Sequence, residues 1–204
     1  QEDFDCTVYG LDWNNMLCGE RVCASEIEKY SRKYTSKGKS RDRFVNWYTP
    51  DINQISGNKQ ILLCQKENLG WDVSQRKSYM NFLVIIALLT LMLSLVSGLV
   101  IEVSLKTLIL SAIIPTWPIF SFAIQNIIDN NSAITDKTKL KYAIEIVEQK
   151  KTPSKKYTRQ IQDLIYLNRM NNNLIFDWYY NFYRESNQSG VSYASRKAVS
   201  RIVK

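Results

Sequence analysis

Histidine is absent from this chain of 204 residues, and glycine is scarce, with only 7 residues. Without histidine the chain cannot assemble a Ser-His-Asp or Cys-His nucleophile, nor a metal site built on imidazole ligands. With so few glycines it holds neither a glycine-rich phosphate loop nor a dinucleotide-binding fingerprint. We therefore expect no enzyme, no catalytic residue, no metal and no cofactor. Catalysis by carboxylates alone stays open, although no motif points to it.

Cysteine is also scarce, and all 4 cysteines lie in the first third of the chain. Cys18 and Cys23 are separated by four residues, a poor spacing for a zinc site in a chain without histidine. A disulfide framework would need an oxidising compartment. Free thiols packed in a cytosolic domain are therefore the favoured interpretation of Cys6, Cys18, Cys23 and Cys64.

Charge is missing from two long neighbouring stretches. Residues 81–101 and 107–128 contain no Asp, Glu, Lys or Arg, and only Glu102 and Lys106 bring charge to the break between them. At a rise of ~1.5 Å per residue, about 20 helical residues cross a ~30 Å hydrocarbon core. The pattern predicts a transmembrane helical hairpin over 79–128.

The net charge of +8 is distributed unevenly around this hairpin. Residues 1–78 carry a net +1, whereas residues 129–204 carry a net +7. Basic residues adjoin both stretches: Arg76 and Lys77 before the first, and Lys137, Lys139 and Lys141 after the second. Because Lys/Arg bias marks the cytoplasmic side, we expect both ends of the hairpin in the cytosol and the 102–106 turn outside. The basic flank could also attract anionic lipid, or bind a nucleotide or nucleic acid.

Local signals predict helices in the first flank. A capping box, Ser25-Glu-Ile-Glu28, predicts a helix to about Tyr34, followed by a basic loop over 35–43. Residues 51–68 read as a second helix. Gly70 is expected to end it, and Asp72 to cap a new helix that enters the membrane.

The second flank is predicted to be helical as well. A helix is expected to start at Thr135 or Asp136, and another to run from Lys155 to Arg169. The last 20 residues are polar and basic, and we expect them to be mobile.

Within the spans, small residues and prolines carry the structural signals. Thr90, Ser94 and Gly98 recur at helical spacing, which allows close approach of another helix in lipid. Pro115 and Pro118 remove helical hydrogen bonds and should kink the second span. The kink is either an ordinary packing feature or a hinge that opens a pore.

Two clusters combine arginine with flat aromatic side chains, the pairing that recognises a phosphorylated base. Guanidinium groups fork onto phosphate oxygens while aromatic rings stack on the base. The candidate ligand-binding residues are Trp71 and Arg76 before the first span, and Arg159, Arg169, Tyr180 and Arg184 after the second. Alternatively, the aromatic rings form an interfacial belt beside the spans, and the arginines pair with aspartates inside the soluble domain. Both interpretations stay open.

At these residues the chain resembles the SMODS-associated four-transmembrane effectors, pore-forming proteins of bacterial cyclic-oligonucleotide antiphage systems. The matching segments are Gln1–Cys6, Gly10–Asn14, Trp47-Tyr48, Cys64-Gln65 with Asn68, Trp71-Asp72, Gln162-Asp163 with Arg169, and Asp177-Trp178 with Tyr180 and Arg184. Each match is short, and together they span most of the chain.

The resemblance implies an effector of the bacterial inner membrane that permeabilises this membrane when a nucleotide second messenger or a partner activates it. It also implies three kinds of partner, namely the lipid bilayer, a cyclic oligonucleotide and further copies of the chain in a homo-oligomer. No DNA or RNA polymer is expected. The alternative function is a membrane-anchored receptor or scaffold without pore activity.

One departure from the family is plain, since four membrane helices are expected and two are found. We expect the missing pair upstream of Gln1, so that the hairpin is half of a four-helix membrane domain. The expected fold is therefore mainly α. The hairpin at 79–128 separates two flanks, 1–78 and 129–204, and the resemblance implies that these pack into one helical cytosolic domain.

Overall fold

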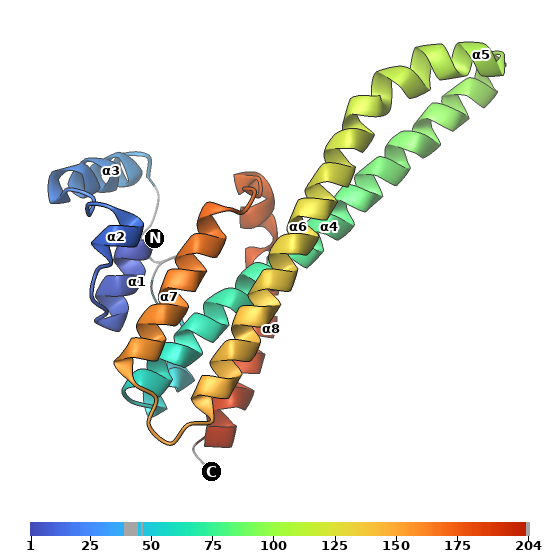
Figure 1. Cartoon of the computed structure of the whole chain (residues 1–204). Helices are drawn as coiled ribbons and strands as arrows, with labels where there is room; N and C mark the ends of the chain where they lie inside the picture. The colour runs from blue at the N-terminus through green and yellow to red at the C-terminus, as the bar shows by residue number, and fades with distance from the viewer. Residues whose placement is uncertain (39–44, 46, 203–204) are drawn as a thin grey trace.

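The computed structural model describes residues 1–38, 45 and 47–202, and every regular element in this part of the chain is helical. A long helical hairpin projects from a smaller helical domain (Figure 1). In chain order the elements are α1 (Glu2–Tyr9), α2 (Asn15–Cys18), α3 (Ala24–Ser36), the 3-10 helix η2 (Pro50–Gln54), α4 (Asn58–Val100), α5 (Leu105–Leu108), the π-helix η3 (Ile109–Ile113), α6 (Ile114–Glu148), α7 (Lys155–Met170) and α8 (Asp177–Ile202).

The hairpin confirms that the chain holds two candidate membrane-spanning helices. The helical stretches 58–100 and 105–148 are long and apolar enough to cross a membrane. In the most apolar window of each, only 17% and 6% of the residues are buried. A core helix of a soluble protein would bury these side chains. Their outward orientation therefore fits lipid as the surrounding solvent.

The two limbs of the hairpin approach each other closely near its tip. A Cβ atom on Gly98 would lie 2.6 Å from Leu108 Cδ1, so a larger residue would require the Leu108 side chain to move. Ser94, one turn earlier, is also buried, and its hydroxyl donates to the Thr90 carbonyl within the same helix. Gly98 therefore lies at a contact between the two limbs, and the expected role of the small residues in helix approach within lipid stays a prediction.

The prolines of the second span stand directly after a π-helical turn. Pro115 occupies the first turn of α6, Pro118 lies inside this helix, and η3 precedes both. Proline has no N–H and its ring crowds the preceding turn, so a wider turn before it relieves the clash. Figure 1 shows the chain bending between α5 and the straight part of α6. The hinge at Pro115 and Pro118 stays a prediction.

The expected helix break before the membrane is wrong. Gly57, with φ of 70°, ends the irregular segment before it, and α4 then runs without interruption from Asn58 to Val100. Gly70 lies inside this helix, where a Cβ atom would make only ordinary contacts, 3.8 Å from Lys141 Nζ and 3.9 Å from Val191 Cγ1. Asp72 caps no helix and instead forms ion pairs with cations of α4 and α6.

Two expectations for the second flank also need correction. No helix begins at Thr135 or Asp136, since α6 is continuous from the second span to Glu148. The last residues are helical to Ile202, and Val191 and Val199 are buried against the domain, which is why this end is ordered.

Two predicted helices are confirmed within one or two residues at each end. They are α3, which begins after Cys23 without a capping box, and α7. Most of the loop expected over 35–43 lies outside the described residues.

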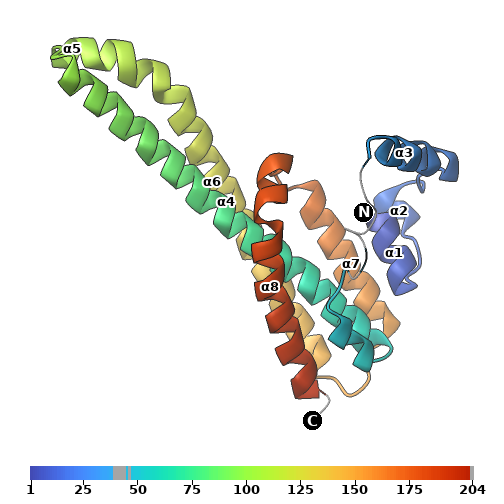
Figure 2. The same ribbon diagram turned by 180° about the vertical axis from the view of Figure 1, so that it is seen from behind.

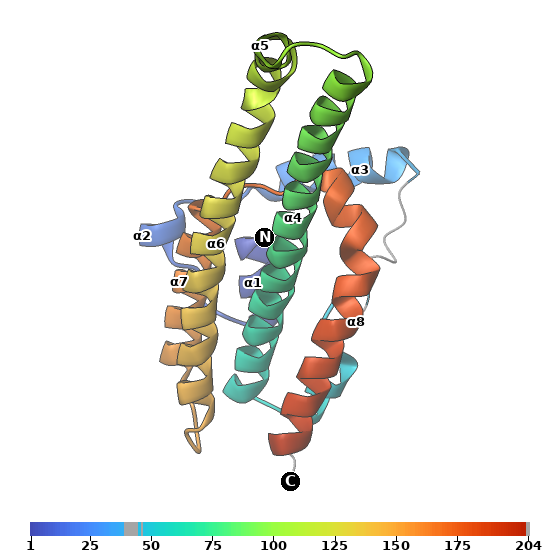
Figure 3. The same ribbon diagram turned by 90° about the vertical axis from the view of Figure 1, so that its right-hand side faces the viewer.

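The domain beneath the hairpin is built around the lower halves of α4 and α6. Helix α8 lies along α4 on one side, and α7 packs against α6 and α4 on the other, with α1 beyond α7 (Figures 2 and 3). Three buried apolar clusters hold it together. The first comprises Cys6, Tyr9, Leu11, Ile52, Ile55, Leu63, Cys64 and Val199; the second Leu62, Leu69, Ile144, Ile161 and Ile165; the third Tyr79, Leu83, Ala123 and Tyr179.

Candidate functional site

A cavity of about 1200 Å³ lies where the hairpin joins the domain. Its walls come from the N-terminal segment, from Val45, Trp47 and Tyr48, and from α4, α6, α7, the α7–α8 junction and α8. Its polar and aromatic lining residues include Glu2, Trp47, Trp71, Asp72, Arg76, Lys137, Asn168, Arg169, Tyr180 and Arg184.

Helix α4 supplies one continuous wall of this cavity. Asn68, Trp71, Asp72, Gln75 and Arg76 all line it. Residues three to four apart lie on one face of a helix, so this spacing turns all five side chains toward the cavity. The same helix continues into the first span, and the wall of the cavity is thus mechanically part of the hairpin.

Asp72 forms an ionic bridge between the two limbs at their base. Its Oδ1 lies 3.1 Å from Arg76 Nε on the same helix, and its Oδ2 lies 2.9 Å from Lys137 Nζ on α6. Arg76 also donates to Asn130 Oδ1 on α6 at 2.6 Å. The contacts of Asp72 and Arg76 therefore join α4 to α6 just below the apolar stretches.

Lys137 is the most deeply placed cation of the cavity. It is 1% exposed, and its ammonium group also donates to Asn168 Oδ1 on α7. Burial lowers the pKa of Lys137, while the negative charge of Asp72 opposes this effect. A second anion reaching this ammonium would favour its charged form further.

Arg169 on α7 is held by the acidic N-terminal helix. Its Nη1 lies 2.6 Å from Asp5 Oδ2 and 3.9 Å from Glu2 Oε2. Gln162 donates to both carboxylates, at 3.2 Å and 2.8 Å. Burial raises the pKa of Asp5, and the Arg169 charge opposes this shift. The flank before the hairpin is thereby fastened to the flank after it.

Aromatic rings flank the cations. Trp71 and Tyr180 pack with ring centroids 5.0 Å apart and a tilt of 54°, which brings α4 and α8 together. The guanidinium of Arg184 stands 5.9 Å from the Trp47 ring centroid, within the range of a cation–π contact. Flat rings beside guanidinium groups are what stacking on a base next to a phosphate requires.

Five of the six candidate ligand-binding residues line this cavity: Trp71, Arg76, Arg169, Tyr180 and Arg184. Arg159 lies outside its lining. The Arg159 guanidinium contacts Glu2 at 2.9 Å and Asp163 at 2.8 Å, and also donates to Cys6 Sγ at 3.0 Å. Its position corresponds to the alternative in which arginine and aspartate hold the soluble domain together.

Lys137 is a cavity residue that the sequence interpretation used only for topology. A signal was present, because Lys137 falls on the buried stripe of α6 together with Ala133 and Ile144, at helical spacing. A lysine on an apolar stripe needs an anionic partner, which is Asp72 here.

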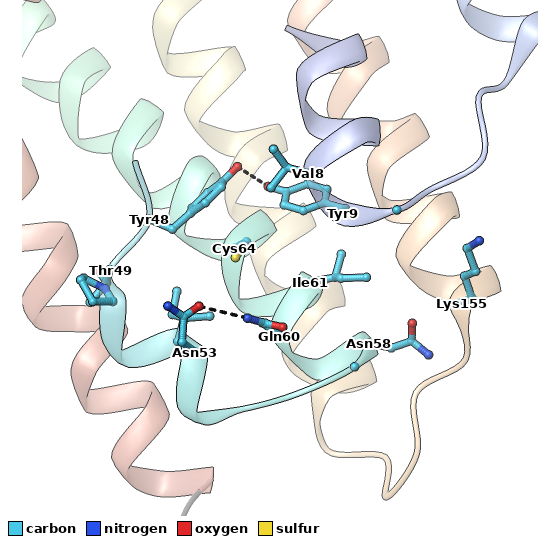
Figure 4. A pocket seen from close by; sticks show the side chains of 14 residues that line it. Val8, Tyr9, Tyr48, Thr49, Asn53, Asn58, Gln60, Ile61, Cys64 and Lys155 are labelled. Atoms are coloured by element: carbon cyan, nitrogen blue, oxygen red, sulfur yellow. Dashed lines mark hydrogen bonds between the residues drawn. The ribbon is translucent and has the colours of Figure 1, made fainter. Parts of the chain in front are cut away.

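A second cavity of about 620 Å³ lies at the far end of the domain (Figure 4). It is lined mainly by the end of α1, residues 48–53 and the first turns of α4. Among the described residues that line it, only Lys155 carries a charge, and its ammonium lies 3.3 Å from Asp12. This cavity lacks the group of cations that distinguishes the larger one.

Two buried thiols stand near the core rather than at a reactive surface. Cys6 accepts a hydrogen bond from Arg159, and Cys64 packs beside it in the first apolar cluster. Burial raises the pKa of Cys6 to about 11 and that of Cys64 to about 12, which disfavours the thiolate. Within the described residues, no group of three His, Cys, Asp or Glu side chains is placed to hold a metal ion.

Comparison with known proteins gives two matches. A family model described as "SMODS-associating 4TM effector domain" matches residues 1–198. A relative from Bacillus cereus (strain VD146), described as a probable CBASS effector molecule, is 26% identical over 122 residues. The aligned part covers 60% of this chain and 40% of that relative, so the chain spans well under two thirds of its length. No solved structure matches the chain.

Proposed function

The chain belongs to the SMODS-associating 4TM effector family, and from this premise we propose that it permeabilises the bacterial inner membrane during antiphage defence. In this proposal a cyclic oligonucleotide enters the cavity beneath the hairpin and triggers the change. The name of the relative, a probable CBASS effector molecule, supports a defensive role. Family membership and the two outward-facing apolar helices support a membrane location.

The cavity is the observation that carries this proposal. At about 1200 Å³ it exceeds the ~300–1000 Å³ typical of small-molecule pockets, which leaves room for more than one nucleotide unit. Four cations line it, namely Arg76, Lys137, Arg169 and Arg184, and the Trp71–Tyr180 pair stands among them. Phosphates and bases could therefore be recognised by neighbouring side chains.

Asp72 suggests how binding would act on the hairpin. A phosphate that reaches Arg76 and Lys137 competes with Asp72 for both cations, and the side chain of Asp72 is 28% exposed. Because the Asp72–Lys137 pair joins α4 to α6, its replacement would change how the two limbs are held at their base. In the hinge hypothesis, the second limb would change its bend near Pro115 and Pro118.

A leak would require more helices than this chain offers. Two helices cannot enclose a channel, so the proposal includes assembly of several copies, each contributing its hairpin and the further pair implied by the name of the family. Both ends of the hairpin are proposed to lie in the cytosol, where a nucleotide messenger is made, with the basic flank at the inner face.

A dye-release assay tests this function. The full-length protein is placed in liposomes that hold a self-quenched dye, and cyclic di- and trinucleotides are added in turn. We expect release only with a matching nucleotide. Arg184→Ala should weaken the response by roughly 10-fold, the loss of about 1.4 kcal/mol of charge-assisted bonding. Arg32→Ala, on the exposed face of α3, is the matched control. No release with any nucleotide, together with no membrane depolarisation in cells, would sink the proposal.

A receptor or scaffold without a pore is the second candidate. The apolar stretches carry no charged residue inside the spans, so no ring of charges that would select ions is evident in them. Exchange of the hairpin for an unrelated one distinguishes the two functions. A scaffold would keep its activity after this exchange, whereas a membrane-permeabilising effector would lose it.

Neither candidate includes a catalytic step. The carboxylates considered for an enzyme, Asp163 and Asp177, do not belong to the described lining of the cavity, and each can be replaced by asparagine. We expect full activity in both variants, and a loss of activity without loss of folding would indicate chemistry at these positions.

A further inference from the structure

The junction of α7 and α8 exposes four large apolar side chains, which we call the junction surface. They are Leu174, Phe176, Trp178 and Phe182, exposed to 92%, 47%, 56% and 77%. Exposed apolar groups gathered in one short segment mark an interaction site rather than ordinary surface. We propose that the junction surface binds the lipid interface and anchors the domain to the bilayer. This inference rests on the membrane insertion of the hairpin, which belongs to the proposed function.

The junction surface lies against the two limbs of the hairpin. The Trp178 ring is 5.4 Å from that of Phe82 on α4, and the Phe176 ring is 6.2 Å from that of Phe122 on α6. The start of α8 thus stands beside α4 where the hairpin leaves the domain (Figures 2 and 3), and Phe176, just before α8, contacts α6. The apolar side chains of the junction are continuous with those of the spans.

The depth of these contacts coincides with the expected edge of the hydrocarbon. About 20 residues at ~1.5 Å each cover a core of ~30 Å. Counted back from the tip at Ile101, this distance ends at Asn81, next to Phe82. Counted forward from Leu105, where the helical second limb begins, it ends at Gln125, about one turn beyond Phe122. The rings that touch the junction surface therefore lie within about one turn of the boundary between acyl chains and headgroups on both limbs.

The chemistry of the surface suits this boundary. Tryptophan and other aromatic side chains are enriched where hydrocarbon meets headgroups, because an apolar ring and a polar edge are satisfied together. Lys77 is exposed one turn before the first span, where an ammonium group meets lipid phosphates. A second copy of the chain would not require the surface to stand at this depth, so lipid is the occupant that the position favours.

The surface is held firmly in place. Tyr179, between Phe176 and Phe182 in sequence, is fully buried, and its ring packs 5.1 Å from Tyr79 and 4.5 Å from Tyr183. Leu174 at the edge of this surface, together with its neighbours Ile175 and Tyr180, also lines the large cavity. The same short segment therefore forms a wall of the cavity on one side and faces lipid on the other.

Tryptophan quenching by labelled lipid tests this anchor. The protein is reconstituted in phosphatidylcholine–phosphatidylglycerol vesicles whose acyl chains carry a nitroxide either at carbon 5, near the headgroups, or at carbon 12, near the centre. Trp117 is in the middle of the second span, and it is 63% exposed. We expect the shallow label to quench Trp178 and the deep label to quench Trp117.

Single conservative variants separate the two signals. Trp178→Phe should remove the shallow quenching and keep the deep quenching, whereas Trp117→Phe should do the reverse. Trp13→Phe, distant from the spans, is the control and should change neither. Shallow quenching that persists in Trp178→Phe would overturn the anchor. The anchor would also be overturned if Trp178 were shielded from acrylamide but not quenched by the lipid label, because protein and not lipid would then cover it.

Failure of the proposed function gives a different result. If the deep label quenches nothing in the unaltered protein, the hairpin is not inserted, and the anchor falls with it. If the deep quenching is present and only the shallow component is missing, the membrane insertion stands and the anchor alone is refuted.

Discussion

The hairpin and the domain beneath it follow opposite rules of burial. In the hairpin Leu93 is 70% exposed while Ser94 beside it is 8% exposed. In the domain Lys137 is 1% exposed and Asp5 is 0% exposed. Lipid solvates apolar side chains and gives no hydrophobic drive between helices, so the hairpin buries the small residues that permit close approach of its two helices. Water solvates the domain, which can bury charges only in pairs.

The contrast also explains where the cavity lies. Asp72, Arg76 and Lys137 stand on the domain side of the apolar stretches of α4 and α6. Asp72 keeps its ion pairs there, and its side chain, 28% exposed, can be reached by a ligand from the cytosolic side of the proposed orientation. A change in these pairs acts directly on helices that continue into the spans.

The same substitution in the two regions gives the largest expected difference. Leu62 is fully buried in the domain, and Leu62→Ala should destabilise the fold by about 4 kcal/mol, from lost burial and a cavity. Leu88 is 56% exposed on the hairpin, and Leu88→Ala should cost well under about 1 kcal/mol because lipid fills the space. Thermal unfolding in detergent micelles, followed by circular dichroism, compares them. Equal losses would contradict the two-solvent account.

Removal of one buried charge should be the next largest effect. Asp5→Ala leaves Arg169 with Glu2 as its remaining carboxylate, at 3.9 Å. We expect a loss of about 3 kcal/mol, the lower end for a broken buried pair because Arg169 is partly exposed. Asp12→Ala removes an exposed pair with Lys155 and should cost under about 1 kcal/mol. Urea titration of the detergent-solubilised protein measures both, and the account fails if the two losses agree.

An intermediate effect is expected where the limbs of the hairpin touch. Gly98→Val places new atoms against Leu108, and overpacking of this kind costs about 2 kcal/mol. Leu108→Ala in the same chain should restore most of the loss by vacating the space. The readout is the temperature at which the hairpin unfolds in micelles. A double variant no more stable than Gly98→Val would show that the contact does not set the spacing.

The smallest expected effect depends on pH. Burial raises the pKa of Glu67 above its usual 4.5, although Thr49 donates to this carboxylate through its N–H and its hydroxyl. Between pH 4.5 and the raised pKa of the folded state, Glu67 is protonated in the folded state and ionised in the unfolded state. Its favourable contribution to stability, present below pH 4.5, is therefore lost as the pH rises through the folded pKa.

Glu67→Gln removes this titration. Its stability relative to the unaltered protein should therefore increase between pH 4 and pH 7, whatever constant offset the amide introduces. Unfolding midpoints measured across this range provide the test. A stability difference that does not change with pH would show that Glu67 titrates alike in both states.

The sequence allowed prediction of features that depend on neighbours in the chain. The spans follow from uncharged runs, and α7 follows from its apolar spacing and the basic break before it. The continuity of α4 could not be predicted, because Gly70 and Asp72 look like helix-end signals. Asp72 instead pairs with Lys137, which lies far away in sequence.

The cavity could be predicted only in part, because the residues that meet in it also lie far apart in sequence. Arginines and aromatic rings near the spans pointed to a site, and Trp71 and Tyr180 do meet there. Whether an arginine lines the cavity depends on the carboxylates with which it pairs. Arg159 pairs with Asp163 on its own helix and with Glu2 on α1, and the second contact depends on the tertiary fold.

The distance between the limbs of the hairpin in lipid tests the central claim, that the cavity controls the spans. Nitroxide labels at Met92→Cys and Ile114→Cys, both lipid-facing, report this distance by electron paramagnetic resonance in a protein whose accessible Cys18 and Cys23 are serine. Cyclic di- and trinucleotides are added in turn, and their binding is measured in parallel. We predict that a nucleotide that binds shifts the distance distribution, and that Lys137→Met abolishes this shift. A nucleotide that binds the cavity and leaves the distribution unchanged would contradict the account.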